Sequence, residues 1–384
     1  MITLNGKYNF ANIMLDKEDV DQGVRDQVMT FLDHPAMRGG YIAVMPDCHV
    51  GKGSVIGFTM RLSKYVIPNI VGVDIGCGVV SYCLGDKLGF DRVLFEKRIR
   101  EKIPLGKEHH KKSNPIIDKY RNQIYLDIAK KIGMKEDVVN LSIGTLGGGN
   151  HFIEVDEDTE GKIWLTVHSG SRNFGNRIAL YWQTIAEELC QKFFYEGNKE
   201  LSFLPIDLGG GEYLNDMYVA QAYAVSNRIA IIEQIVGKFD PVPNETFISS
   251  VHNYISTDDS IIRKGAISAR AGEKCIIPFN SKEGIAICMG KGNKLYNFSA
   301  PHGAGRVHGR KEMQRMLAEG KLSVEGYQKE LADAGVYTTT ANKATIDEAP
   351  EAYKDKELIL KHIAPTVAVL KMMKPIMSVK AAED

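Results

Sequence analysis

Five residues whose side chains bind divalent ions stand beside apolar runs or glycine-rich loops. Asp74 and Cys77 lie three apart in VGVDIGCG, His151 follows GTLGGGN, His168 follows IWLTV and His252 follows FISSV. One carboxylate, one thiolate and three imidazoles suit borderline ions such as Mn, Zn or Co. A thiolate can also bridge two ions, and two-metal sites suit phosphoryl chemistry. We therefore predict a metal centre, although spacing alone does not show that the five residues converge.

Basic residues gather in other segments that also contain glycine, and these segments are candidate phosphate binders. They are HSGSRNFGNR (residues 168–177), RKGAISAR (263–270) and HGAGRVHGR (302–310). Arginine can grip phosphate with two parallel hydrogen bonds, and backbone N–H groups of glycine loops can cradle it. The sequence has no Walker A motif, no GxGxxG after a strand and no GxSxG elbow. His302, flanked by small residues in SAPHGAGR, fits three roles: nucleophile toward phosphorus, sixth metal ligand or structural histidine.

The elements that must position these residues follow from hydrophobic periodicity. Residues 18–33 carry four apolar residues at helical spacing, which predicts an amphipathic helix: Val20, Val24, Val28 and Leu32. Short apolar or β-branched runs predict strands at residues 41–44, 54–60, 70–73, 79–83, 162–167, 247–251, 274–278 and 285–289. Long helices are predicted at residues 176–195 and 213–239. The part from residue 311 onward is predicted to be mostly helical apart from residues 337–341, and residues 107–114 to be a surface loop.

Composition bounds the class of protein. The chain has 384 residues, 44% hydrophobic and 25% charged, which is typical of a globular protein and excludes disorder, collagen and a multi-span membrane protein. Six cysteines without a CxxC pair, and no apparent signal peptide, predict reduced thiols in a cytoplasmic protein. Without a repeat or a long linker, we expect one mixed α/β (α+β) domain over residues 1–384 and no membrane partner.

Eight segments, taken together and in order, resemble the RtcB family of RNA ligases. They are MPDCHVGKG, VGVDIGCG, GTLGGGNHFIEV, VHSGSRNFG, VHNY, RKGA, PHGAGR and DEAPEAYKD, and they run from about residue 45 to residue 380. The resemblance implies a single RtcB-like domain with central mixed or antiparallel sheets flanked by helices. It also implies a GTP- and Mn(II)-dependent ligase. Such an enzyme joins RNA 3′-phosphate or 2′,3′-cyclic phosphate ends to 5′-hydroxyl ends, in RNA repair or tRNA splicing.

The resemblance also implies a role for each matching residue. Asp74, Cys77, His151, His168 and His252 would hold Mn(II), with Cys77 bridging two ions. His302 would take GMP from GTP and pass it to the RNA 3′-phosphate. Nucleotide contacts would come from Asn150, Glu154, Gly303, Ala304, Gly305, Arg306, Tyr353 and Lys380. The expected partners are RNA ends and GTP, a monomer is favoured, and the need for an archease-like activator stays open.

The chain also departs from the family pattern. Residues 278–284 read PFNSKEG where members often have PGSMG, so only Ser281 and Gly284 are left to make similar nucleotide contacts. Cys48 and Gly309 replace an aliphatic residue and a serine, which suggests a compact, divergent branch acting on broken RNA. Two alternatives follow: a metal-dependent phosphoesterase that processes RNA ends without ligation, and an RNA-binding protein with a degenerate site. Because the net charge is zero, we expect RNA recognition to focus on the ends, with roughly two to five phosphate contacts.

Overall fold

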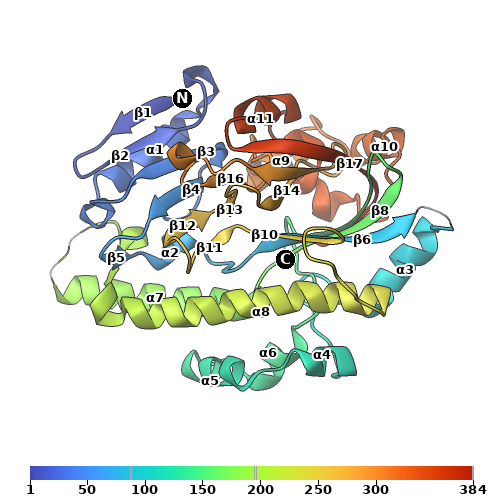
Figure 1. Cartoon of the computed structure of the whole chain (residues 1–384), viewed down its shortest axis with the longest axis horizontal. Coiled ribbons are helices and arrows are strands. Elements are labelled where there is room, and N and C mark those ends of the chain that lie inside the picture. The colour runs from blue at the N-terminus through green and yellow to red at the C-terminus, as the bar shows by residue number, and fades with distance from the viewer. Residues whose placement is uncertain (87–88, 194, 196, 383–384) are drawn as a thin grey trace.

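The first of two sheets that organise the chain has six strands (Figure 1). The computed structural model describes residues 1–86, 89–193, 195 and 197–382. Neighbours in this sheet are antiparallel except β2 and β3, which are parallel. In spatial order its strands are β1 (Ile2–Asn5), β2 (Phe10–Ile13), β3 (Ile42–His49), β4 (Ile56–Arg61), β12 (Ile261–Lys264) and β11 (Asn253–Ile255).

The second sheet has seven strands and is antiparallel throughout. The Ile276 N–H donates to Ser250 Oγ at 3.0 Å, so its two edge strands lie side by side and the sheet nearly closes into a barrel. In order, its strands are β10 (Phe247–Val251), β6 (Gly78–Asp86), β8 (Lys162–Ser169), β7 (Phe152–Glu157), β17 (Val367–Lys380), β15 (Ile285–Gly290) and β14 (Lys274–Pro278). Two small antiparallel pairs complete the strands: β13 (Ala266–Ser268) with β16 (Ser299–Pro301), and β5 (Tyr65–Val66) with β9 (Leu204–Pro205).

Two long helices run beneath both sheets in Figure 1 and join their cores. They are α7 (Arg172–Lys192) and α8 (Gly211–Val236), close to the two helices predicted from the sequence. Helix α8 buries Tyr223 in the core of the six-stranded sheet and Ile231 in that of the seven-stranded sheet. The short helices α4 (Pro115–Lys119), α5 (Gln123–Lys131) and α6 (Glu136–Leu141) lie on its far side (Figure 1).

The remaining helices are short. The predicted helix over residues 18–33 is present as α1 (Gln22–Leu32), and it starts later because the Asp21 carboxylate caps it at the Gly23 N–H. The other α-helices are α3 (Arg92–Lys102), α9 (Arg310–Ala318), α10 (Val324–Asp333) and α11 (Lys356–Ile363). Single turns, mostly 3₁₀, are η1 (Lys17–Asp19), η2 (Pro35–Met37), η3 (Lys199–Leu201), η4 (Ile206–Gly210), η5 (Lys294–Tyr296), η6 (Lys343–Glu348) and η7 (Pro350–Ala352). No helix in the described ranges has the length and apolar character to cross a membrane.

The mixed α/β class is confirmed, as are most of the predicted strands, but two predictions were wrong. The predicted strand over residues 70–73 begins instead within helix α2 (Pro68–Val71), where the proline occupies the first turn, a position that favours a helix. The C-terminal part is not mostly helical to its end, because residues 367–380 form β17. That run lies between β15 and β7, so strand pairing decides its conformation, and a bulge between Pro375 and Met377 accommodates the proline.

Candidate active site

One end of the seven-stranded sheet carries four of the five predicted metal ligands. Cys77 directly precedes β6, His151 directly precedes β7, His168 is the penultimate residue of β8, and His252 directly follows β10. These strands are antiparallel neighbours, so the start of one lies beside the end of the next. The register pairs His168 with Val79 and with Phe152, and the His252 N–H donates to the Cys77 carbonyl at 2.9 Å. Strand topology thus brings together residues far apart in the sequence.

The donor atoms of all five predicted ligands converge. Cys77 Sγ lies 3.4 Å from His151 Nε2 and 3.3 Å from His168 Nε2. Asp74 Oδ2 lies 3.0 Å from His151 Nε2, and His168 Nε2 lies 3.4 Å from His252 Nε2. All except Asp74 are buried. Each donor atom thus lies within 3.4 Å of another, and those of Cys77, His151 and His168 all lie within 4.8 Å of one another, which spacing alone could not establish.

Backbone contacts aim these side chains at one another. The Asn150 carbonyl lies 2.9 Å from His168 Nδ1, so Nδ1–H donates to it and the Nε2 lone pair faces the cluster. The Ser171 N–H donates to Asp74 Oδ1 at 3.2 Å. A Cβ at Gly170 would lie 2.1 Å from the same oxygen, so only glycine lets this carboxylate approach. Burial lowers the pKa of His168 and of His252 well below the usual value, which keeps both imidazoles neutral.

The donor set fits a divalent ion. Ligand atoms 2.0–2.3 Å from an ion in a tetrahedral site lie about 3.3–3.7 Å from one another, close to the spacings seen among these donors. Burial raises the pKa of Cys77 well above its usual value, and a bound cation would deprotonate that thiol. Arg228, which sequence reasoning missed, is fully buried and donates to the Gly76 and Ser169 carbonyls at 2.7 and 2.8 Å. It joins the loop just before β6 to the last residue of β8.

His302 comes to this cluster from the β13–β16 pair. It directly follows β16, and its ring centre lies 4.7 Å from that of His252. Its Nδ1 lies 2.6 Å from Asp47 Oδ2, and its backbone N–H donates to the same oxygen at 3.2 Å. The Asp47 side chain is fully buried in β3. Asp47 Oδ2 accepts the hydrogen bond from Nδ1–H, so the lone pair of Nε2 is free. Asp47 was missed from the sequence although MPDCH contains it.

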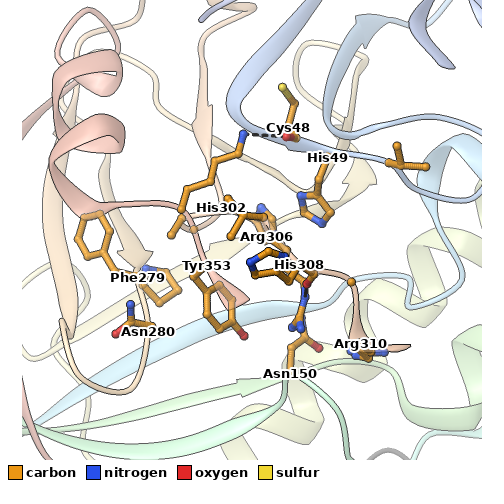
Figure 2. A pocket seen from close by; sticks show the side chains of 18 of the residues that line it. Cys48, His49, Asn150, Phe279, Asn280, His302, Arg306, His308, Arg310 and Tyr353 are labelled. Carbon is orange, nitrogen blue, oxygen red and sulfur yellow. Dashed lines mark hydrogen bonds between the residues drawn. The ribbon is translucent and has the colours of Figure 1, made fainter. Parts of the chain in front are cut away.

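A pocket of about 770 Å³ opens beside His302 (Figure 2). His168 and His302 line it together with Phe279 and Asn280 of the divergent segment 278–284, so this segment does shape the pocket. Figure 2 shows Arg306, Tyr353 and Asn150 around the same space as His302. The residues predicted to contact a nucleotide line it, except Gly284: Asn150, Glu154, Ser281, Gly303, Ala304, Gly305, Arg306, Tyr353 and Lys380.

Glu348, a third residue missed from the sequence, anchors three of these pocket residues. Its buried carboxylate accepts from Arg306 at 2.9 Å, from Lys380 at 3.2 Å and from the Tyr353 hydroxyl. Burial alone would raise the pKa of Glu348, but Lys380 and Arg306 outweigh it and lower that pKa. The Arg306 guanidinium also lies 5.2 Å from the centre of the Tyr353 ring. The segment DEAPEAYKD therefore contributes both a wall of the pocket and the anion that orients it.

Comparison with known proteins agrees with this geometry. A family model described as "tRNA-splicing ligase RtcB" matches residues 27–138 and 125–381. The chain belongs to the RtcB family. It is 30% identical over 378 residues to the RNA-splicing ligase RtcB of Escherichia coli strain K12, covering 88% of this chain and 90% of that relative. It is 26% identical over 408 residues to the tRNA-splicing ligase RtcB of Nanoarchaeum equitans, covering 84% and 83%. The protein is accordingly an RtcB-type RNA-splicing ligase.

In this RtcB family member the PHGAGR loop is tied to β3. Gly305 has φ +74°, and a Cβ there would lie 2.1 Å from the Asp47 carbonyl oxygen. The Lys354 ammonium donates to the carbonyls of Pro46 and Cys48 at 3.0 and 2.8 Å. These contacts hold the loop against the strand that supplies the Asp47 carboxylate. The distance between that carboxylate and the His302 imidazole is therefore fixed by the backbone on both sides.

The candidate phosphate binders divide into two groups. His308 and Arg310, from the third basic segment, line the pocket of this RtcB protein. The cations of residues 263–270 serve the fold instead. Arg263 is fully buried against Ser299 and Asp259, and the Lys264 ammonium donates to backbone carbonyls, among them that of Asn69 at 3.0 Å. Arg172 of the first segment donates to Thr145 Oγ1 at 3.0 Å and to the Gly106 carbonyl. Among the arginines of the three segments, those that line the pocket are Arg306 and Arg310.

Proposed function

We propose that this RtcB family member joins RNA 3′-phosphate or 2′,3′-cyclic phosphate ends to 5′-hydroxyl ends, in RNA repair or tRNA splicing, using GTP and Mn(II). The observation that carries the proposal is the place of His302. Its imidazole stands between the five-ligand cluster and the pocket lined by the predicted nucleotide contacts. A nucleophile beside both a divalent-ion site and a nucleotide site is the arrangement that nucleotidyl transfer requires.

In the first step, His302 Nε2 attacks the α-phosphorus of GTP. A P–N bond forms, the bond to the departing oxygen breaks, and pyrophosphate leaves. Attack places positive charge on the imidazole, which the buried Asp47 carboxylate, 2.6 Å from Nδ1, stabilises. The ions, held by Asp74, Cys77, His151, His168 and His252, would neutralise negative charge on the phosphates. The lone pair that attacks is available because Asp47 keeps the proton on Nδ1.

The later steps transfer GMP to RNA and then release it. An oxygen of the RNA 3′-phosphate attacks the phosphorus on His302, and the imidazole leaves with its Nδ1 proton still held by Asp47. The 5′-hydroxyl then attacks the activated RNA phosphate, forms the new phosphodiester and displaces GMP. A 2′,3′-cyclic phosphate is first opened by water. The glycine-rich backbone of residues 303–305 and the Arg306 guanidinium are suited to bind the phosphates that take part.

The proposal includes the domain organisation and the oligomeric state of the protein. We treat residues 1–384 as one RtcB-like catalytic domain with its sheets flanked by helices, because the site needs both sheets. Asp47 comes from the six-stranded sheet, and Glu154 and Lys380 come from the seven-stranded sheet. A monomer suffices, since all these residues belong to one chain. GTP is the co-substrate and two Mn(II) ions are the expected cofactors.

The test is covalent labelling. Protein incubated with [α-³²P]GTP and Mn(II) is run on a denaturing gel, and RNA with 3′-phosphate and 5′-hydroxyl ends is assayed for joining. We expect a labelled band that His302→Ala loses. His109→Ala, at an exposed histidine that does not line the pocket, is the matched control and should keep the band. Absence of label in the wild type, or label retained in His302→Ala, would refute the mechanism. Loss of cyclic phosphate without any joined product would favour the phosphoesterase instead.

A further inference from the structure

Two buried carboxylates stand in line beneath the nucleotide pocket. Glu154 and Asp156 lie two apart on β7, so both side chains project from the same face of the strand. Glu154 is 3% exposed and lines the pocket, whereas Asp156 is 0% exposed and lies behind it. Thr166 of β8 donates its hydroxyl hydrogen to Asp156 Oδ2 at 2.8 Å. Asp156 Oδ1 is buried without a hydrogen-bond partner, and two buried like charges on adjacent positions of one strand face are too costly to coexist.

The positive charge near the pair is shared with a third carboxylate. Lys380 of β17 is the cation that acts on Glu154, and its ammonium is bonded to Glu348 of η6 at 3.2 Å. Asp158, the residue after the end of β7, is neutralised separately, because Lys371 lies 2.9 Å from its Oδ2. The pair therefore lacks a full counter-charge of its own. Burial raises the pKa of Glu154 well above its usual value, and burial raises that of Asp156 to about 7.

We propose that Glu154 and Asp156 hold one proton between them, and that Asp156 takes it when Glu154 binds the N–H edge of guanine as a carboxylate. The inference rests on the proposed nucleotide site and adds Asp156 as a positioning residue that sets the charge of the base-facing group. Guanine presents two N–H donors on this edge, which call for an acceptor without a proton. The empty pocket keeps the proton on Glu154, so binding transfers it inward to Asp156.

This transfer has a signature in the pH dependence of binding. In the wild type below about pH 7, Asp156 carries a proton of its own and binding releases the proton of Glu154, so nucleotide affinity rises with pH. Above about pH 7 Asp156 is ionised and takes up that proton, so affinity levels off. From there on, each further binding event has to move the proton from Glu154 to Asp156. Asparagine at position 156 resembles protonated aspartic acid and removes that cost. Affinity in Asp156→Asn then keeps rising until Glu154 itself ionises. Variant and wild type agree at acid pH, where both release one proton from Glu154.

The experiment measures GMP binding to the full-length, Mn(II)-loaded protein by calorimetry between pH 6 and 8.5. We expect equal affinities at pH 6 and about tenfold tighter binding by Asp156→Asn at pH 8.5, if the two pKa values differ by one unit. Thr166→Val removes the bond that stabilises ionised Asp156, so it should give a smaller gain of the same sign. Asp158→Asn, the matched control at a buried aspartate that follows β7 and pairs with Lys371, should bind GMP as the wild type does. AMP, which lacks an N–H at N1, should gain nothing.

The outcomes separate the inference from the proposed function. Suppose that the wild type binds GMP but that the affinity of Asp156→Asn follows a parallel curve or is lower at every pH. This result overturns the shared proton and leaves the proposed nucleotide site standing. Wild type that binds no GMP at any pH overturns both. If Asp156→Asn does not fold, Thr166→Val decides alone: tighter binding confined to alkaline pH supports the shared proton, and an unchanged curve refutes it.

Discussion

Replacing Asp47 by asparagine tests whether the carboxylate or only the shape of the site activates His302. Asp47 Oδ2 accepts from both the His302 imidazole, at 2.6 Å, and its backbone N–H, at 3.2 Å. Asparagine has nearly the same shape, so the fold should survive. Its amide N–H₂ group beside Nδ1 would favour the tautomer with the proton on Nε2. That tautomer has no lone pair directed at the α-phosphorus of GTP.

The expected loss follows from two effects that act on the same atom. The wrong tautomer removes the nucleophile, and the neutral amide no longer stabilises the imidazolium formed on attack. Asp47 is fully buried, so solvent does not screen its charge. In the analogous aspartate–histidine pair of serine proteases, the same substitution costs about 10⁴ in rate. We expect the guanylylation rate at saturating GTP to fall by about 10³–10⁴, or about 4–5 kcal/mol of barrier, with little change in the KM for GTP.

The assay is rapid-quench labelling with [α-³²P]GTP over a range of GTP concentrations. It separates the maximal rate from the concentration dependence, which a structural defect would alter together. Cys48→Ala, the next residue of β3, removes a buried thiol without touching the hydrogen bond to His302 and should label within about twofold of wild type. A near-normal maximal rate in Asp47→Asn, with only a raised KM, would refute the role given to this carboxylate.

Three further predictions follow from local geometry. Adding Mn(II) at 100 times its Kd to chelator-treated protein should raise the free energy of unfolding by about 2.7 kcal/mol. Scanning calorimetry measures this gain, and the Cys77→Ala variant should lose most of it. Gly305→Ala should cost about 1–3 kcal/mol and reduce labelling, because it strains a positive φ and drives a Cβ into a β3 carbonyl. Gly309→Ala, where a Cβ meets nothing within 4 Å, should do neither. Burial alone would raise the pKa of Asp158, but hydrogen bonds from Lys371, from Trp164 and from two backbone N–H groups together outweigh burial and lower that pKa to about 2. The resulting stability is present above about pH 4 and lost as pH falls toward 2, so urea unfolding should show a loss of about 2 kcal/mol that Asp158→Asn lacks.

The sequence indicated the secondary structure wherever local pattern and tertiary position agree. The periodicity of α1 and the runs rich in Ala, Leu and Ile of α7 and α8 predicted those helices. Prediction from the sequence pattern failed for α2, whose four residues are too few to show a helical period. It failed again for β17, a 14-residue strand whose neighbours β15 and β7 lie far from it in the chain. Cross-strand pairing, which no local window contains, decided that segment.

The same division holds for the site. Residue type and glycine-rich context were enough to select Asp74, Cys77 and His302, because thiolate, carboxylate and imidazole chemistry belongs to the side chain itself. Convergence, and the partners that tune each group, came only with tertiary structure. Asp47 and Glu348 are ordinary acids in the sequence. They become the support of the nucleophile and the anchor of the pocket because strand register and burial place them within hydrogen-bonding distance of their partners. Water screens the charge of an exposed carboxylate, so its position matters little. Burial beside one partner removes that screening and lets the carboxylate act on that partner specifically.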